Sequence, residues 1–307
     1  MPAGTSAPEF VTGRVSVTVP ATSANLGPGY DTLGLALDWR DTLHAEVIDF
    51  GLVVDVEGEG SGAVPLDESH LVVQAMFAAF DALGGRPSGL TLRCVNVIPH
   101  ARGLGSSSAA IVGGLALARA LVVGGADQLG DEALFELAAR IEGHPDNVAP
   151  AVFGGLTISG QEAETFYTAT APVDERVGAV VFIPPTGVET KVARGLLPDV
   201  VPHAEAAADA GNAALLVAAL AGQPEHLLRA TRDLLHQEYR RPAMPDSLAL
   251  VDALRADAVP AVVSGAGPTV LAFTSAPAEA AALEERCPEG WTSRVLAVAT
   301  AGVLADS

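Results

Sequence analysis

The chain has 307 residues, 49% of them hydrophobic, which is enough for two packed domains with a sizeable core. Its 37 acidic and 17 basic residues give a formal net charge of −20. This charge argues against nucleic acid and anionic membrane surfaces as partners, because both would repel the protein.

The cysteine content and the lengths of the apolar segments indicate the cellular compartment of the protein. Cys94 and Cys287 form neither a metal-ligand spacing nor a disulfide framework. The first residues lack a basic region followed by an apolar run, and no uninterrupted apolar stretch is long enough to span a bilayer. We therefore expect a soluble, cytoplasmic protein with no membrane contact.

The first half of the chain alternates strand-like and helix-like segments. Short runs rich in β-branched residues predict strands, and longer periodic runs that end at glycine predict helices. The expected strands are 15–19, 33–37, 43–48, 90–97 and 154–159, and the expected helices are 69–83, one that begins at Ser106, and 131–142.

A polar segment over residues 161–176 is the expected domain boundary, giving domains of residues 10–165 and 166–307. Beyond it we expect strands at 177–183, 260–264, 269–273 and 294–299 and helices at 203–221, 225–235 and 247–256. Glycine-linked strand pairs suggest antiparallel neighbours, so an α+β fold is favoured over a doubly wound parallel sheet.

A glycine-rich loop precedes the helix that begins at Ser106. Ile111, Leu115 and Ala118 give this helix one apolar face, while Gly103 and Gly105 stand at its entrance. Free backbone N–H groups and the positive end of the helix dipole suit a phosphate there. Taken alone, the pattern is equally consistent with an ordinary capped helix after a flexible loop.

The loop is neither of the two commonest nucleotide motifs. No Gly-Lys-Ser/Thr follows the glycines as in a P-loop, and Lys191 is the only lysine in the chain. No acidic residue closes a βαβ unit about twenty residues on, as a dinucleotide fingerprint requires.

Two further motifs accompany the loop. The segment PATSANLGPGYDTLGLAL spans residues 20–37, and VVSGAGPTVLAF spans residues 262–273. In this order the three motifs resemble those of the GHMP kinases. Within that family, EGHPDNVAPAVFGGL at 142–156, ETKVAR and LHQEYR resemble the homoserine kinases.

The resemblance implies a GHMP kinase fold, with an N-terminal α+β domain containing a left-handed βαβ unit and a ferredoxin-like C-terminal domain. It also implies ATP and Mg²⁺ as cofactors, L-homoserine as the substrate, and a homodimer. By the same resemblance, phosphate-binding residues would be Pro99, Gly103, Leu104, Gly105, Ser106, Ser107 and Ser108.

Homoserine carries an ammonium, a carboxylate and a hydroxyl. The resemblance places Asp31 and Asn25 at the amino group and the reacting end, with His144 at the hydroxyl. Asp31 could equally be a turn aspartate that binds its own backbone.

The carboxylate of homoserine calls for a cationic pair. The resemblance assigns it to Arg194 and Arg240, whose planar forks suit a carboxylate. Arg241 leaves the second assignment ambiguous by one position. Thr190 shares a helix face with Arg194, and Gly267 completes the expected substrate site.

For the metal, the resemblance gives Ser107 with Glu136 as partner and Glu142 as the alternative. Asn147 stands where mevalonate kinases have an aspartate, and an amide cannot act as a general base. Catalysis would then depend on positioning and charge stabilisation by the loop amides, Ser107 and Mg²⁺, and the catalytic residues would be Asn147, His144 and Ser107. His144 would donate or accept a hydrogen bond, and Asp146 is the rival base.

Two departures from the family pattern and two other functions remain. His70 stands where asparagine is usual near the adenine, and Ser108 where alanine is usual. A GHMP kinase for another hydroxylated metabolite is the second hypothesis. A nonenzymatic protein that binds a nucleotide or a partner on the same scaffold is the third.

Overall fold

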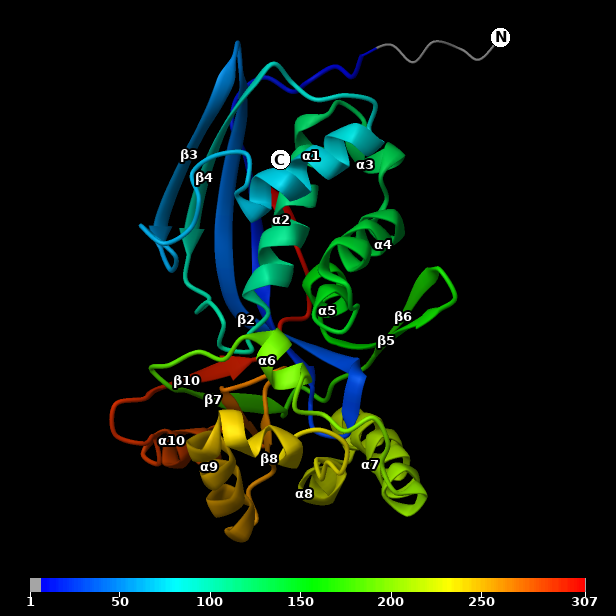
Figure 1. Cartoon of the computed structure of the whole chain (residues 1–307), viewed down its shortest axis with the longest axis vertical. Helices are drawn as coiled ribbons and strands as arrows, with labels where there is room; N and C mark the ends of the chain where they lie inside the picture. Colours follow the sequence, from blue (N-terminus) through cyan, green and yellow to red (C-terminus); the bar gives the residue numbers. More distant parts are fainter. Residues whose placement is uncertain (1–6, 307) are drawn as a thin grey trace.

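The structure, a computed structural model, describes residues 7–306 and is built around two β-sheets stacked along the long axis of the molecule (Figure 1). The first sheet has the strand order β11-β1-β2-β4-β3, and β5 pairs with both β2 and β6. Its strands are β1 (Val15–Asn25), β2 (Gly29–Ile48), β3 (Gly51–Gly58), β4 (Gly89–Asn96), β5 (Leu156–Glu162), β6 (Thr165–Ala171) and β11 (Leu304–Asp306).

Helices cover one face of this first sheet, as Figure 1 shows. The central one is α2, in which Ile111, Leu115 and Ala118 are buried as their spacing predicts. Its neighbour α1 connects β3 to β4 along the chain, and these two strands pair in parallel. Together they form the strand–helix–strand unit expected of the family. The helices of this layer are α1 (Leu71–Ala82), α2 (Ser106–Leu121), α3 (Gly125–Gln128), α4 (Asp131–Glu142) and α5 (Val148–Phe153).

The second sheet is antiparallel, with the order β10-β7-β9-β8, which is the ferredoxin-like arrangement. Its strands are β7 (Gly178–Ile183), β8 (Ala261–Val263), β9 (Val270–Thr274) and β10 (Thr292–Ala297). Around it lie α6 (Thr190–Arg194), α7 (His203–Gly222), η1 (Pro224–His226), α8 (Leu227–Ala230), η2 (Glu238–Ala243), α9 (Pro245–Ala256) and α10 (Pro277–Glu284). The α+β class expected from the sequence is confirmed.

Several strands differ from the sequence-based expectations, and β3 was not expected at all. The two strands expected at 33–37 and 43–48 are one long strand, β2, whose pairing with β1 shifts register after Pro20. The polar segment expected as a linker contains β6, which pairs with β5, so the boundary at residues 165 and 166 falls within this hairpin. The last strand, β11, returns to pair with β1 in the first sheet.

One helix of the described part of the chain, α7, is long and apolar enough to cross a membrane by length and composition alone. This is weak evidence for a membrane span, because a helix of a soluble protein can pass the same test.

Candidate active site

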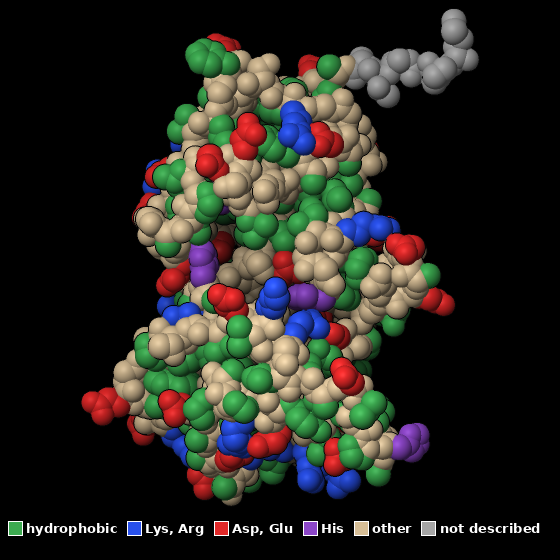
Figure 2. Space-filling model, viewed as in Figure 1, with side chains coloured by type: hydrophobic (Ala, Val, Ile, Leu, Met, Phe, Trp, Pro, Cys, Tyr) green, Lys and Arg blue, Asp and Glu red, His purple; other side chains and the backbone are tan. Residues whose placement is uncertain are grey.

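The glycine-rich loop and the start of α2 lie at the waist between the two sheets, where arginine and histidine side chains gather (Figure 2). Gly105 is the N-cap residue, with φ 70°, and no side chain caps the helix. A Cβ atom on Gly105 would lie 1.9 Å from Thr22 Oγ1, and one on Gly103 would lie 2.2 Å from the Ser264 carbonyl oxygen. The close packing thus requires glycine at both positions and leaves the first N–H groups of α2 free to bind an anion.

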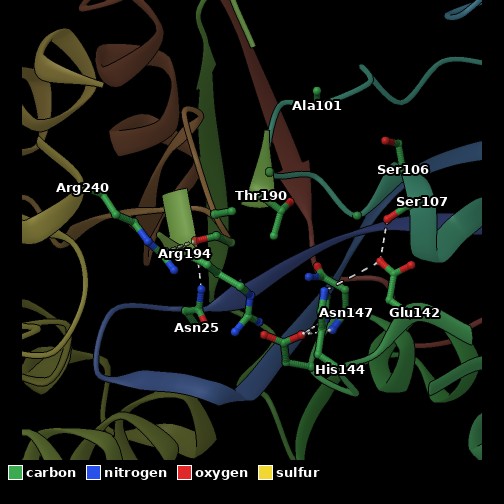
Figure 3. A pocket seen from close by; sticks show the side chains of 15 residues that line it. Asn25, Ala101, Ser106, Ser107, Glu142, His144, Asn147, Thr190, Arg194 and Arg240 are labelled. Atoms are coloured by element: carbon green, nitrogen blue, oxygen red, sulfur yellow. Dashed lines mark hydrogen bonds and ion pairs between the residues drawn. The ribbon is translucent and has the colours of Figure 1, made fainter. Parts of the chain in front are cut away.

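A cavity of about 260 Å³ opens beside this loop and is lined from both halves of the molecule. Figure 3 shows Arg240 and Arg194 on one side of it and Ser107, Glu142 and His144 on the other. The lining residues are Asn25, Ala101, Gly103, Gly105, Ser106, Ser107, Glu142, His144, Asp146, Asn147, Thr190, Arg194, Arg240, Gly265 and Ala266.

Glu142, the last residue of α4, faces the start of α2. Its Oε1 accepts hydrogen bonds from Ser107 Oγ at 2.5 Å and Ser108 Oγ at 2.9 Å. Glu136 lies elsewhere on the helix, is partly exposed, and forms an ion pair with Arg140. Of the two glutamates considered for the metal, the structure therefore brings Glu142, and not the expected Glu136, to Ser107 and Ser108.

His144, Asp146 and Asn147 follow Glu142 in the loop that leads to α5. His144 Nδ1 lies 2.7 Å from Asp146 Oδ1, and its Nε2 lies 4.0 Å from Glu142 Oε1. Burial alone would lower the pKa of His144, but the hydrogen bond to Asp146 and the charges of Asp146 and Glu142 together raise it. Asn147 Oδ1 accepts a hydrogen bond from Thr22 Oγ1, which fixes its amide group.

Asp31 and Arg194 form a two-pronged ion pair, with N–O distances of 2.7 and 2.9 Å. Arg194 comes from the short helix α6, which also places Thr190 in the cavity wall, as their spacing predicts. Asp31 lies just after the loop between β1 and β2, and its backbone N–H donates to Asn25 Oδ1. The anion and the cation expected to bind an amino acid thus bind each other in the free protein.

Arg240, 1% exposed, lines the same side of the cavity as Arg194 (Figure 3). Its Nη1 donates to the carbonyl oxygen of Gly265, which also accepts from Asn25 Nδ2. Arg241 instead pairs with Glu238 and Asp252 on the surface. Of the two arginines, Arg240 therefore lines the cavity and Arg241 does not.

A second cavity, of about 300 Å³, adjoins the first at Ser106 and Ser107. Its walls include Leu43, Val64 and Leu71, with His70 and His100 among the polar groups. Burial lowers the pKa of both histidines. The cavity is therefore mainly apolar, with neutral imidazoles, which suits a flat heterocycle.

Comparison with known proteins identifies the family. Residues 70–155 match the model described as the GHMP kinases N terminal domain, and residues 213–292 match the GHMP kinases C terminal model. Homoserine kinase of Streptomyces avermitilis is 53% identical over 295 residues, covering 96% of each chain. Homoserine kinase of Streptomyces coelicolor is 56% identical over 269 residues, covering 88% of this chain and 87% of the relative.

The chain belongs to the homoserine kinase group of the GHMP kinase family. A solved structure agrees: homoserine kinase from Cytophaga hutchinsonii superposes with a TM-score of 0.84 at 25% identity, covering 97% of this chain and 99% of that one. The resemblance inferred from the three motifs is thereby confirmed.

Most of the site residues expected of a GHMP kinase lie together in the structure. Those lining the first cavity are Asn25, Gly103, Gly105, Ser106, Ser107, His144, Asn147, Thr190, Arg194 and Arg240. Asp31 joins them through Arg194, and Ser108 through Glu142.

Besides Asp31 and Ser108, four expected residues of this GHMP kinase do not line the first cavity. The side chain of Leu104 is buried in the hydrophobic core. Pro99 precedes Ala101, the first residue of this segment that lines the cavity. At the turn that contains Gly267, the lining residues are Gly265 and Ala266. Glu136 points to solvent, as described above.

Sequence reasoning missed three contributors to the GHMP kinase site. Thr22 fixes Asn147, and the Tyr30 hydroxyl accepts a hydrogen bond from Arg194 Nη1 at 3.0 Å. His236, considered below, contacts Arg240. Thr22 and Tyr30 lie within the first motif and His236 within LHQEYR, so the motifs contained a signal, but no spacing rule gives these contacts.

Proposed function

We propose that this protein transfers the γ-phosphoryl group of ATP to the side-chain hydroxyl of L-homoserine, making O-phospho-L-homoserine for threonine biosynthesis. One observation carries the proposal: Arg240 and Arg194, which is paired with Asp31, stand at one end of a cavity whose other end is the start of α2 with its free N–H groups. An amino acid fits the charged end, and a phosphoryl donor fits the other. The names of the relatives support the same reaction.

ATP would occupy both cavities. Its phosphates would lie against the N–H groups of α2 and the serine hydroxyls, where the helix dipole favours negative charge. Its base would enter the second cavity, which shares Ser106 and Ser107 with the first. His70 belongs to this second cavity and also caps α1, since its Nδ1 accepts from the Val72 N–H at 3.3 Å.

The residues at the start of α2 fit a magnesium ion. Ser107 offers a hydroxyl and Glu142 a carboxylate, which are the hard oxygen ligands that Mg²⁺ prefers. No group of three or more histidine, cysteine or acidic residues that could hold a metal occurs within residues 7–306, which agrees with an ion that takes its other ligands from phosphate and water. Bound there, Mg²⁺ would neutralise charge on the phosphates.

Homoserine binding would exchange one ion pair for two. The ammonium would replace Arg194 at Asp31, and the carboxylate would take up Arg194 and Arg240. This orientation sends the side-chain hydroxyl toward His144 and Asn147, on the side of the cavity that holds the phosphate loop. Asp31 disfavours mevalonate as substrate, because that molecule has no ammonium.

The chemistry would then depend on positioning. Asn147, fixed by Thr22, can donate its amide N–H groups to the reacting oxygen, and it cannot remove a proton. His144, held by Asp146, is oriented toward Glu142 and the hydroxyl, and the raised pKa of His144 favours its cationic form, which stabilises developing negative charge.

Three further features belong to the proposal. The family resemblance supports a homodimer, which light scattering of the purified protein would test. A cytoplasmic location, where Mg-ATP is available, is also part of the proposal. We assign residues 10–171, together with β11, to the ATP-binding domain. The second sheet and the helices around it form the other domain.

The reaction is tested by ADP release from Mg-ATP with L-homoserine, D-homoserine, L-threonine, L-serine and mevalonate, with each product identified by mass. The expected result is turnover confined to L-homoserine. Turnover of mevalonate would overturn the substrate assignment while leaving the phosphate loop in place. ATP binding without turnover of any of the five would overturn the proposed reaction.

A further inference from the structure

His236 is a fully buried histidine that joins the substrate side of the cavity to the loop between β1 and β2. It lies just before η2, four residues before Arg240, and its side chain is 0% exposed. It does not line the cavity itself, so any effect on the substrate must pass through another residue.

The two ring nitrogens of His236 have different partners. Nε2 lies 2.8 Å from the carbonyl oxygen of Gly27, which can only accept, so Nε2 carries the hydrogen. Nδ1 lies 2.9 Å from Nη1 of Arg240, which can only donate, so Nδ1 carries the lone pair. These partners fix one neutral tautomer, and burial, which lowers the pKa of His236, favours the same neutral form.

The contact with His236 decides which edge of Arg240 remains available. Nη1 is shared between His236 and the Gly265 carbonyl oxygen. Nε of Arg240 is buried and has no hydrogen-bond partner among the described residues. The bonds of Nη1 thus hold the guanidinium in place. The Nε–Nη2 edge remains available, and it has the geometry of a bidentate carboxylate contact.

The ring of Tyr30 holds this arrangement from one side. Its centroid lies 5.2 Å from that of His236, and the guanidinium carbons of Arg240 and Arg194 lie 5.6 and 5.7 Å from it. The imidazole and both guanidinium groups therefore share one aromatic neighbour, which restricts their rotation.

We propose that His236 is a positioning residue for the substrate carboxylate: by accepting a hydrogen bond from Arg240 Nη1, it presents the Nε–Nη2 edge of Arg240 to the amino acid. This inference rests on the proposed function, in which that carboxylate belongs to homoserine. A histidine that only fills the core would support the loop of Gly27 without affecting how the carboxylate is recognised.

Two substitutions separate the bonds of His236. His236→Asn keeps an acceptor near the position of Nδ1, and hence the contact with Arg240. His236→Gln keeps a donor near the position of Nε2, and hence the contact with Gly27, but loses the acceptor for Arg240. His226→Gln, at an exposed histidine in η1, is the matched control.

The test compares kcat/KM for L-homoserine with kcat/KM for its amide, which lacks the carboxylate charge. We expect the wild type and His226→Gln to prefer homoserine by roughly 10-fold or more, the value of a charged hydrogen bond. His236→Asn should keep most of this preference, and His236→Gln should lose most of it. Both rates come from one preparation, so the ratio does not depend on the fraction of the variant that folds.

Each other outcome is decisive. A preference for homoserine that survives in His236→Gln would overturn the role of His236 and leave the proposed function standing. Equal loss of preference in His236→Asn and His236→Gln would overturn the role of the Nδ1 acceptor. A wild type that does not distinguish homoserine from its amide would overturn the carboxylate role of Arg240, and with it both the proposed substrate mode and this inference.

Discussion

Asp31 forms an ion pair with Arg194, a residue of the cavity wall, although 163 positions separate them in the chain. Both side chains are about one-third exposed, so the pair is only partly desolvated and can open at moderate cost. An amino acid zwitterion offers each partner a replacement of opposite charge. Under the proposed function, the substrate would have to open this pair, and a molecule that carries both charges would satisfy both partners.

Asp31→Asn should raise KM for homoserine about 10- to 100-fold, because the ammonium loses its counter-ion. Steady-state kinetics measure this change. The control is Asp81→Asn on α1, which breaks an exposed ion pair with Arg86 and should leave KM unchanged. With 4-hydroxybutanoate, which has no ammonium, Asp31→Asn should perform at least as well as wild type, because Arg194 is already free. Equal losses on both substrates would contradict the exchange of ion pairs.

Glu142→Gln and Ser107→Ala should each lower kcat about 100-fold or more, the scale of one lost transition-state contact. The measurement is kcat across a titration of Mg²⁺ at saturating ATP and homoserine. Glu136→Gln on the same helix is the matched control and should stay within about 2-fold, because it breaks only a partly exposed pair with Arg140. The reverse pattern, with Glu136→Gln inactive, would restore Glu136 as the metal ligand.

The choice between these two glutamates shows where sequence reasoning ends. The limits of α4 follow from the sequence, because Gly130 and Gly143 flank a strongly periodic segment. Its rotation does not follow: six residues at ~100° each place Glu142 about 240° around the helix from Glu136. Only packing against α2 determines which carboxylate faces Ser107.

Long-range pairing is the second limit. The three motifs predict that the phosphate loop and the substrate groups belong to one site, and the structure brings them together. The strand β11 has three residues, too few for a pattern, and its pairing with β1 depends on contacts across the whole chain. The contact of His236 with Gly27 likewise joins residues 209 positions apart.

Gly105→Ala should lower kcat and reduce stability by roughly 1 to 3 kcal/mol, through the positive φ and the clash with Thr22. Gly124→Ala is the matched control, since its φ is 71° and its Cβ would meet only Gln128 Nε2, at 3.9 Å. The difference in kcat and unfolding free energy between the two variants measures the effect of the close contact with Thr22, because both glycines have nearly the same positive φ. Kinetics and chemical denaturation measure it. Equal effects on stability and unchanged kcat would show that the loop tolerates a side chain.

Asp41 is a buried carboxyl group on β2, in the wall of the second cavity. Its Oδ1 accepts the backbone N–H groups of Val97 and Ile98, at 2.6 and 2.9 Å. Burial raises the pKa of Asp41 to about 6, against the lowering effect of these two hydrogen bonds. The folded protein therefore binds a proton more tightly at Asp41 than the unfolded chain does.

The raised pKa of Asp41 determines how the stability of the protein changes with pH. Between the unfolded pKa near 4 and the folded pKa near 6, the folded state holds more protons, so the contribution of Asp41 to stability falls as pH rises through this range. Asp41→Asn keeps an acceptor oxygen for both N–H groups and removes the charge. Relative to wild type, the variant should gain roughly 1 to 3 kcal/mol in unfolding free energy from pH 4 to pH 7.

Urea denaturation of the ligand-free protein at several pH values measures this difference. Asp209, whose pKa burial also raises to about 6, titrates in the same range, so wild-type stability alone would mix the two groups. The comparison with Asp41→Asn cancels the contribution of Asp209, because it is present in both proteins. A stability difference that does not change between pH 4 and pH 7 would contradict the raised pKa, since an aspartate with an ordinary pKa is ionised in both states over most of this range.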